Sequence, residues 1–590
     1  MRFVWAAAAF VLAAVMIGAG IAQRTVFEGP TSVSAAIEIT GDAPYVLIDG
    51  AVLTSHDGSQ LLSIEQDGEI FAAYGRTADV EAWLAKSDYT RVTLEDGEIV
   101  SSAVAATDPP AADADPIAPA GSDLWLAEFS EQDLLSTRLQ LPAEMSVLIA
   151  TDGIAAAPAS ISLTWPLHYS TPWAGPLILG GAVLLVVGIV LYVLGVRHVR
   201  RSRGPRRKGL PMPATEPVDL AVEAGDKGVI SAMPTRRQLS RGRRALVAAP
   251  VVVSAMLVSG CSADAWPDLA PIATPSATAT VVVPDDQGSP VVTQAQAQAI
   301  VGRIAETVAS ADEAMDATAA ATRLDGTALA VRETNYTLRA AVADQPALTA
   351  IPDGELDLVL PEANDAWPRT FLAVAAGDSA DMVMSITQED PWSPYKLTDV
   401  AQLTSDTTLQ LAPTYVGAIP ILADSPFLAL APDQLAAAYA DVLTNGDASE
   451  FASLFDTAND AFLKTLDADR ADRVASFNQT GSETGSISFS AEAADVAPVA
   501  LATLDSGAIV VVTVYDRDTV TPTNEDAVIK LNGDPANPVV QTLAGVDESS
   551  TGFTTTYADQ LFFFVPSQSS NQLISLLGFS SDVLDAKEVE

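Results

Sequence analysis

The sequence predicts a multidomain membrane protein with a β-rich first outside domain and an α+β second outside region. Three observations support this class. Three long apolar segments interrupt a chain of 590 residues. The stretch between the first two segments alternates apolar and polar residues, as antiparallel strands do. The C-terminal half shows helical spacing followed by short strand-like runs, twice in succession. A chain of this length accommodates about three or four domains.

The expected organisation follows the chain from end to end. It comprises a transmembrane helix or signal anchor at 3–22, a β-rich outside domain at 25–172, a transmembrane helix at 173–196, a basic cytoplasmic linker at 197–244, a signal-peptide-like span at 245–260, a flexible tether at 261–292, and two α+β lobes at 293–415 and 416–590.

The first two apolar segments are long enough to cross a bilayer. FVWAAAAFVLAAVMIGAGIA (3–22) carries no charge, and 20 residues cover the hydrocarbon core of ~30 Å. We expect a retained helix; the alternative is a signal peptide cleaved near Ala22, where the residues are small. WAGPLILGGAVLLVVGIVLYVLGV (173–196) begins at an interfacial Trp and precedes RHVRRSRGPRRKG. That basic flank indicates a transmembrane helix with its end in the cytoplasm.

Charge is distributed very unevenly. Residues 197–244 contain 13 Lys and Arg against four acids, a net charge of +9, which leaves −53 for the rest of a chain whose total is −44. A short basic block in an acidic protein indicates a cytoplasmic loop. It places 25–172 and 261–590 outside the cell and 197–244 inside. The acidic surface argues against nucleic acid as a partner, because phosphate repels it.

The third apolar segment has the parts of a lipoprotein signal. TRRQLSRGRR precedes ALVAAPVVVSAMLVSG (245–260), and Cys261 follows. Arg236 and Arg237 resemble the twin-arginine export motif. Val258, Ser259 and Gly260 would form the signal-peptidase box, and the thiol of Cys261 would accept the lipid. The alternative is a free thiol at the outer end of a third span.

From Met233 onward the chain therefore reads as a complete lipoprotein that begins with its own signal peptide. Residues 1–232 and 233–590 look like two proteins joined head to tail. Either two neighbouring genes have fused, or the sequence as read joins the products of two neighbouring genes.

The inventory of reactive residues excludes several kinds of site. Cys261 is the only cysteine, so no intramolecular disulfide can form. The three histidines are His56, His168 and His198, which leaves none beyond Cys261. A histidine metal site or a Ser-His-Asp triad is therefore excluded from 262–590. We assign no catalytic, cofactor-binding or metal-binding residue and expect no cofactor.

The first outside domain reads as short antiparallel strands around one helix. TADVEAWLAK (77–86) predicts a helix that Thr77 caps. A small β-sandwich-like domain is expected. His56 and Asp57 could form a site, but SHDGS is more typical of a solvated turn. The runs YGRTADVEAWLA, SDLWLAEF and MSVLIATDG resemble a family of actinobacterial membrane proteins of unknown function over about 1–200, and this resemblance implies no catalytic residues.

The C-terminal half reads as two lobes, each with helices first and antiparallel strands after. Thr293 is the expected cap of the first helix. Cone-shaped domains of the cystatin or nuclear-transport-factor-2 kind fit this order. TRLDGTALAVRETNYTLRA, LPEANDAWPRTFLAVA and DPWSPYKLTDVAQL resemble a C-terminal domain of unknown function in actinobacterial lipoproteins, from about Thr293 to the end.

Some members of that second family carry a glycosyltransferase label, which the sequence does not support. Asp516 and Asp518 in VVVTVYDRD could form the metal-binding Asp-x-Asp of such an enzyme, and Asp467 and Asp469 form a weaker pair in a helix. No phosphate-cradling glycine loop and no alternation of β and α units accompany them. A charged hairpin turn is the simpler interpretation of the first pair.

The leading functional hypothesis is a non-catalytic, membrane-anchored protein of the cell envelope that acts as a binding or scaffold module. Its partners would be membrane lipid and other envelope proteins or cell-wall glycan. The expected location is the plasma membrane, with both globular regions extracytoplasmic. The alternative is an extracytoplasmic glycan-acting enzyme that works through two carboxylates. Transport is a third idea, but it predicts charged or strongly polar residues inside the spans, and these spans have no charged residue and no Asn or Gln.

Overall fold

The computed structural model describes residues 2–26, 30–39, 41–110, 117–167, 173–202, 290–377, 379–404, 409–533 and 536–590. These residues form two compact units. The helical unit takes its described residues from Met1–Ala35, Asp57–Ser59 and Thr164–Thr280, and the sheet unit takes them from Ala36–His56, Gln60–Leu163 and Val281–Glu590. The third apolar segment lies outside the described residues, as does the lipoprotein signal with Arg236, Arg237, Val258, Ser259, Gly260 and Cys261.

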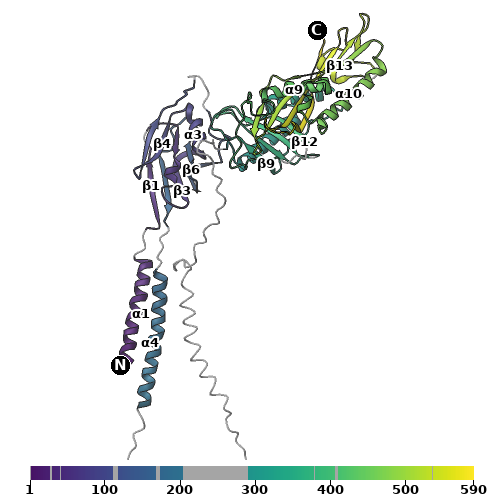
Figure 1. Cartoon of the computed structure of the whole chain (residues 1–590). Helices are drawn as coiled ribbons and strands as arrows, with labels where there is room; N and C mark the ends of the chain where they lie inside the picture. The colour runs from purple at the N-terminus through teal and green to yellow at the C-terminus, as the bar shows by residue number, and fades with distance from the viewer. Residues whose placement is uncertain are drawn as a thin grey trace, which may run out of the picture. The chain divides into compact units, whose positions relative to one another are not determined.

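The helical unit contains two long apolar helices, α1 (Arg2–Thr25) and α4 (Ala174–Ser202) (Figure 1). Both are long and apolar enough to cross a membrane, over Phe3–Thr25 and Ala174–Arg200. These are the two such helices in the described part of the chain. The first lies near the N-terminus, where a signal sequence has the same length and composition.

Helices α1 and α4 pack against each other in antiparallel fashion through residues seven positions apart. The large side chains of α1 rest on glycines of α4: Phe3 on Gly195, Phe10 on Gly188 and Ile17 on Gly181. A Cβ added at Gly188 would lie 3.0 Å from the Phe10 ring. Small residues let two apolar helices approach closely, which is how helices associate where no hydrophobic effect drives them.

The sheet unit contains most of two domains, and the first is the β-domain (residues 32–166), of which residues 32–35, 57–59 and 164–166 are counted with the helical unit. Its eight strands run in the order β1-β8-β3-β7-β2-β4-β5, with β6 paired to β3. The strand bounds are β1 Ser32–Glu38, β2 Tyr45–Ile48, β3 Gln60–Arg76, β4 Tyr89–Glu95, β5 Glu98–Val104, β6 Ala127–Leu139, β7 Met145–Ala150 and β8 Ser160–Pro166. The helices are α2 Gly50–Leu53, α3 Thr77–Trp83 and the 3-10 turn η1 Leu84–Lys86.

Three local expectations for this domain were wrong. The run YVLIDGAVLTS (45–55) predicts a single strand, but the strand ends at Ile48 and the chain turns into α2. Strand β2 pairs parallel with β4, because β3 and α3 carry the chain back to the starting end of the sheet between them. Thr77 does not cap α3: Arg76 holds the cap position, and the Thr77 hydroxyl donates a hydrogen bond to the Glu144 carbonyl at 2.9 Å.

The second domain of the sheet unit is the C-terminal domain (residues 290–590). Its nine-stranded sheet has the order β13-β15-β18-β19-β12-β11-β10-β9, with β14 on β15, and a separate pair joins β16 and β17. The strands are β9 Leu356–Pro361, β10 Arg369–Ala375, β11 Met382–Gln388, β12 Lys396–Leu403, β13 Gly485–Ala493, β14 Val499–Ala502, β15 Ala508–Pro522, β16 Ile529–Lys530, β17 Glu548–Ser549, β18 Phe553–Val565 and β19 Ser575–Glu588. The helices are α6 Gln294–Ala314, α7 Ala317–Ala320, α8 Gly326–Ala341, α9 Pro432–Asn445, η3 Gly446–Ala448, η4 Ala452–Leu454, α10 Ala461–Thr480 and α11 Pro538–Ala544.

The predicted start of α6 is confirmed. Thr293 accepts a hydrogen bond from the Gln296 N–H at 3.2 Å, and the Gln296 side chain accepts one from the Thr293 N–H at 3.0 Å. The two bonds form a capping box, which satisfies two backbone donors at the helix start. Ile300, Ile304 and Val308 then recur at helical spacing and are buried.

Three large hydrophobic cores lie in the described part of this domain, beside a smaller one around Val540 and Phe553. One joins α6 and α8 to β10–β12, and a second joins α9 and the start of α10 to β15, β18 and β19. The third core contains Leu372 and Val383 from one half of the sheet with Val511 and Phe562 from the other. The two halves of the sheet are hydrogen-bonded through two residue pairs of β12 and β19, Gln402 with Phe579 and Leu403 with Gly578.

Candidate functional site

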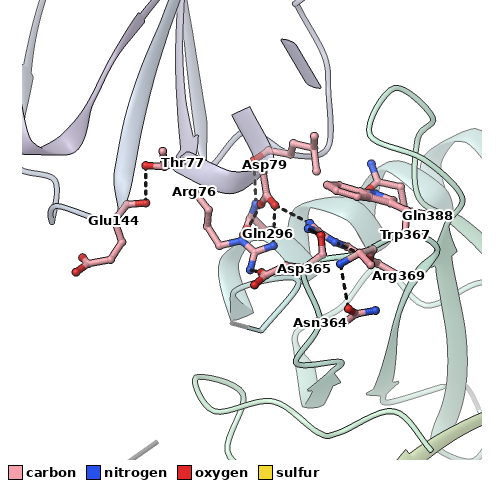
Figure 2. Close-up of polar contacts among 12 residues, drawn as sticks. Arg76, Thr77, Asp79, Glu144, Gln296, Asn364, Asp365, Trp367, Arg369 and Gln388 are labelled. Carbon is pink, nitrogen blue, oxygen red and sulfur yellow. Dashed lines mark hydrogen bonds and ion pairs between the residues drawn. The ribbon is translucent and has the colours of Figure 1, made fainter. Parts of the chain in front are cut away.

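The β-domain and the C-terminal domain touch within the sheet unit, and a buried ion pair crosses this contact (Figure 2). Asp79 lies in the first turn of α3, and Arg369 is the first residue of β10. The Arg369 Nη1 lies 2.6 Å from the Asp79 Oδ1. The side chains of Arg369 and Asp79 are 0% and 1% exposed. Arg76 approaches the same carboxylate from its own domain, with its Nε 2.7 Å from the Asp79 Oδ2.

The loop before β10 holds the Arg369 guanidinium in place. Its Nη2 donates to the Asp365 carbonyl at 2.8 Å, and its Nε donates to the Ala366 carbonyl at 3.2 Å. Its Cζ lies 3.5 Å from the centre of the Trp367 ring, which favours the cation electrostatically. A buried charge is tolerated only when it is paired and hydrogen-bonded. The loop and Asp79 together meet both conditions.

A second buried carboxylate lies at the same contact. Asp123 belongs to the β-domain and is 0% exposed at its side chain. It lies 2.6 Å from the Arg303 Nη2 and 2.5 Å from the Arg323 Nη1, and it accepts a hydrogen bond from the Tyr395 N–H at 2.7 Å. Among the described residues, every donor recorded for Asp123 therefore comes from the C-terminal domain.

Aromatic side chains fill the space beside the ion pairs. The Trp83 ring lies edge-to-face with the Trp125 ring, with centroids 5.6 Å apart. From the C-terminal domain, the Trp392 Nε1 donates to the Trp83 carbonyl at 2.8 Å. Lys86 Nζ lies 3.4 Å from the centre of the Trp392 ring. Buried Trp and Arg are the residue types that carry most of the binding energy at protein interfaces.

Glu362 is a titratable group close to this contact. It directly follows β9, and its Oε2 accepts a hydrogen bond from the Thr370 N–H at 3.1 Å. Burial raises the pKa of Glu362 to about 7, although that hydrogen bond and the charge of Arg369 act in the opposite direction. The carboxyl therefore titrates near neutral pH in the folded protein.

The Asp-x-Asp pair lies elsewhere in the C-terminal domain, and the expectation of a hairpin turn there was wrong. Strand β15 continues through both residues to Pro522. Asp516 and Asp518 are buried beneath α10, where Asp516 pairs with Arg470 and Asp518 pairs with Arg473. Because Arg470 and Arg473 of α10 neutralise the two carboxylates, β15 can bury both aspartates. The sequence next to the strand gives no sign of these arginine partners.

The environment of this pair includes a third acid and a cavity. Asp559 on β18 is fully buried, and burial raises its pKa well above the usual range. Asp518, Arg473 and Tyr557 line a cavity of about 760 Å³. Within the described residues, no group of three or more His, Cys, Asp or Glu side chains is placed to hold a metal ion.

The other residues considered from the sequence are not gathered into a site. His56 is half-buried and Asp57 is exposed in the turn after α2. Asp467 and Asp469 are exposed on α10. Sequence reasoning missed Asp79, Asp123 and their arginine partners.

Comparison with known proteins gives one family. The model of a domain of unknown function (DUF8094) matches residues 288–588. The match covers the C-terminal domain and none of the β-domain. No curated protein and no solved structure shows significant similarity to the chain.

Proposed function

We propose that this chain, which belongs to the DUF8094 family of domains of unknown function, is a non-catalytic, membrane-anchored scaffold of the cell envelope. The β-domain and the C-terminal domain would together form one binding module, held at the membrane by α1 and α4. The observation that carries this proposal is the buried pair of Asp79 and Arg369. Removing Asp79 would leave the buried Arg369 guanidinium without a counter-charge, whereas Asp79 also pairs with Arg76, so the pair favours the arrangement that brings Asp79 to Arg369.

The proposed location is the plasma membrane, with both domains outside. The motivation is the basic block at 197–244 between acidic stretches. Protease added to intact protoplasts should degrade 25–172 and the C-terminal domain and should spare the basic block. Protection of the C-terminal domain would contradict this topology.

We also propose that Cys261 is lipidated and that the chain is cut between Gly260 and Cys261. Mass spectrometry of the native protein, with Cys261→Ala as the control, tests this step. A lipidated peptide that begins at Cys261 is expected. An intact peptide across 255–265 with an unmodified thiol would refute it.

We also propose a fold type for each of the two domains. A sandwich-like β-domain and two lobes of the cystatin or nuclear-transport-factor-2 kind are proposed. The support for the two lobes is that α6 and α8 pack on one half of the C-terminal sheet, while α9 and α10 pack on the other.

The second candidate function is a carboxylate-dependent enzyme that acts on glycans. One observation favours it: Asp518 lines the cavity of about 760 Å³, and burial raises its pKa. Its Oδ1 has no hydrogen-bond partner among the described residues. An acid with a raised pKa beside a cavity is a candidate proton donor. Against this role, Arg473 already pairs with its other oxygen.

One experiment separates the two candidates. The purified chain is incubated with cell-wall glycan, and the bound protein and newly released reducing ends are both measured. The scaffold proposal expects partners to bind without release of reducing ends. Release that is lost in Asp518→Asn but kept in Asp467→Asn, an exposed acid on α10, would establish the enzyme and overturn the scaffold.

A further inference from the structure

We infer that the β-domain and the C-terminal domain bind each other without a covalent connection. The face of the C-terminal domain around Arg369 is then a docking surface for a β-domain that belongs to a separate chain. The partner of a membrane-anchored β-domain would be a DUF8094 domain made or processed as its own polypeptide. This inference rests on the proposed scaffold function and names the partner of its interface.

The construction of the two domains supports binding between separate chains. The eight-stranded sheet contains only β1–β8, and the nine-stranded sheet contains only β9–β15, β18 and β19. Among the described strands, no ladder joins one domain to the other. Each sheet therefore completes its own hydrogen bonding, and the contact between the domains consists of side chains and isolated backbone groups, as an interface between two proteins does.

Asp123 is a buried acid of the β-domain that takes its hydrogen-bond donors from the C-terminal domain. Its carboxylate has no exposed surface, and each of its donors, Arg303, Arg323 and the Tyr395 N–H, comes from the C-terminal domain. If the domains separated, water would have to replace all three donors. A carboxylate that finds its donors only across a contact selects strongly for the partner that supplies them.

The second ion pair and the aromatic groups make the contact specific along its length. If the domains separate, Asp79 of the β-domain keeps its ion pair with Arg76. Arg369 of the C-terminal domain then loses the carboxylate of Asp79. Trp367 and Trp392 of the C-terminal domain pack against the β-domain core that contains Trp83. Two fully buried acids with arginine partners and packed tryptophans are the composition of a strong protein interface.

The arrangement of the chain gives a reason for such an interface. The family match begins at residue 288, after the whole β-domain. The sequence from Met233 reads as a signal peptide followed by a lipoprotein. A C-terminal domain that reached the envelope as its own chain would need a non-covalent contact to join the β-domain, and the interface at Asp79 and Asp123 provides one.

The test cuts the folded chain and asks whether its parts stay together. A specific protease site is placed within 262–289, and the chain is purified in detergent through an N-terminal tag and then cut. Cutting there separates the C-terminal domain from α4, from the third apolar segment and from Cys261. We expect the C-terminal fragment to remain bound to the tagged fragment at physiological salt.

Variants then connect retention to the interface. Asp123→Asn should speed release of the fragment by about 30-fold or more, because truncating one partner of a buried charge pair acts mainly on dissociation. Asp67→Asn, an exposed acid of β3, is the matched control and should not change the rate. Circular dichroism of the released fragment separates release from unfolding. If Asp123→Asn fails to fold, Trp392→Phe tests the same face by removing the hydrogen bond to Trp83.

The outcomes are distinct from those of the scaffold proposal. Immediate loss of the cut fragment from the unmodified protein would overturn the inference, even if the uncut chain still binds envelope partners. Equal release rates for the Asp123 or Trp392 variant and the Asp67 control would also overturn it. A fragment that stays bound while the uncut chain binds no envelope partner would support the inference and refute the scaffold function.

Discussion

Replacing Glu362 by Gln should change how the stability of the C-terminal domain depends on pH. Burial raises the pKa of Glu362 from 4.5 to about 7. Because the folded-state pKa lies above the unfolded one, the protonated carboxyl stabilises the fold. That contribution is fully present below pH 4.5 and is lost as the pH rises through about 7.

The size of the effect follows from this shift. One pKa unit corresponds to about 1.4 kcal/mol, so the wild-type chain should lose about 3 kcal/mol of unfolding free energy between pH 4.5 and pH 8 through this group alone. Gln stays neutral and keeps an oxygen to accept the hydrogen bond from the Thr370 N–H. Glu362→Gln should therefore match the wild type near pH 4.5 and be more stable by about 3 kcal/mol near pH 8.

The assay is urea unfolding of the whole chain in detergent across this pH range, followed by tryptophan fluorescence. Other buried acids with raised pKa values, such as Asp399, are present in both proteins and cancel in the difference. Glu389→Gln, at an exposed position, is the control and should parallel the wild type. Parallel curves for the wild type and Glu362→Gln would refute the reasoning, because they would mean that the folded protein does not hold this carboxyl neutral.

Two further predictions concern the helices. Gly188→Leu should separate α1 from α4, because a Cβ there lies 3.0 Å from Phe10, and overpacking costs about 1–3 kcal/mol; Gly18→Leu, with open space around it, is the control. Thermal unfolding in detergent, followed by circular dichroism, should show a lower midpoint for the first variant only. Thr293→Ala should remove the side-chain acceptor for the Gln296 N–H and destabilise the start of α6 by about 1 kcal/mol, measured as faster amide hydrogen exchange in its first turn.

Local sequence patterns predicted the elements whose causes are local. Thr293 and Gln296 lie three residues apart, and their capping box starts α6 as expected. The apolar runs at 3–22 and 173–196 became α1 and α4 because length and composition alone decide such helices. What composition did not reveal is their pairing, which depends on glycines of one helix facing large side chains of the other.

Residues with distant partners were not predictable in this way. Asp516 and Asp518 read as a turn because charged residues interrupt a strand pattern, yet Arg470 and Arg473 on α10 neutralise them inside the fold. Asp79 reads as an ordinary acid in the first turn of a helix. Its partner Arg369 lies 290 residues away, and no spacing rule connects the two positions.

The charge of the chain explains why such pairs are needed at the contact between the domains. From 290 to 590 the sequence has 44 Asp and Glu against 12 Lys and Arg, so an acidic β-domain approaching this domain is repelled at long range. Three of those 12 cations form ion pairs with buried acids of the β-domain. Arg303 and Arg323 pair with Asp123, and Arg369 pairs with Asp79. At physiological ionic strength, salt screens charges beyond about 8 Å but screens buried pairs much less. Moderate salt should therefore weaken the general repulsion and leave the buried pairs in place, which is the opposite of the response of an exposed, purely electrostatic complex. The domains are thus held by a few positioned cations in a protein that is acidic almost everywhere else.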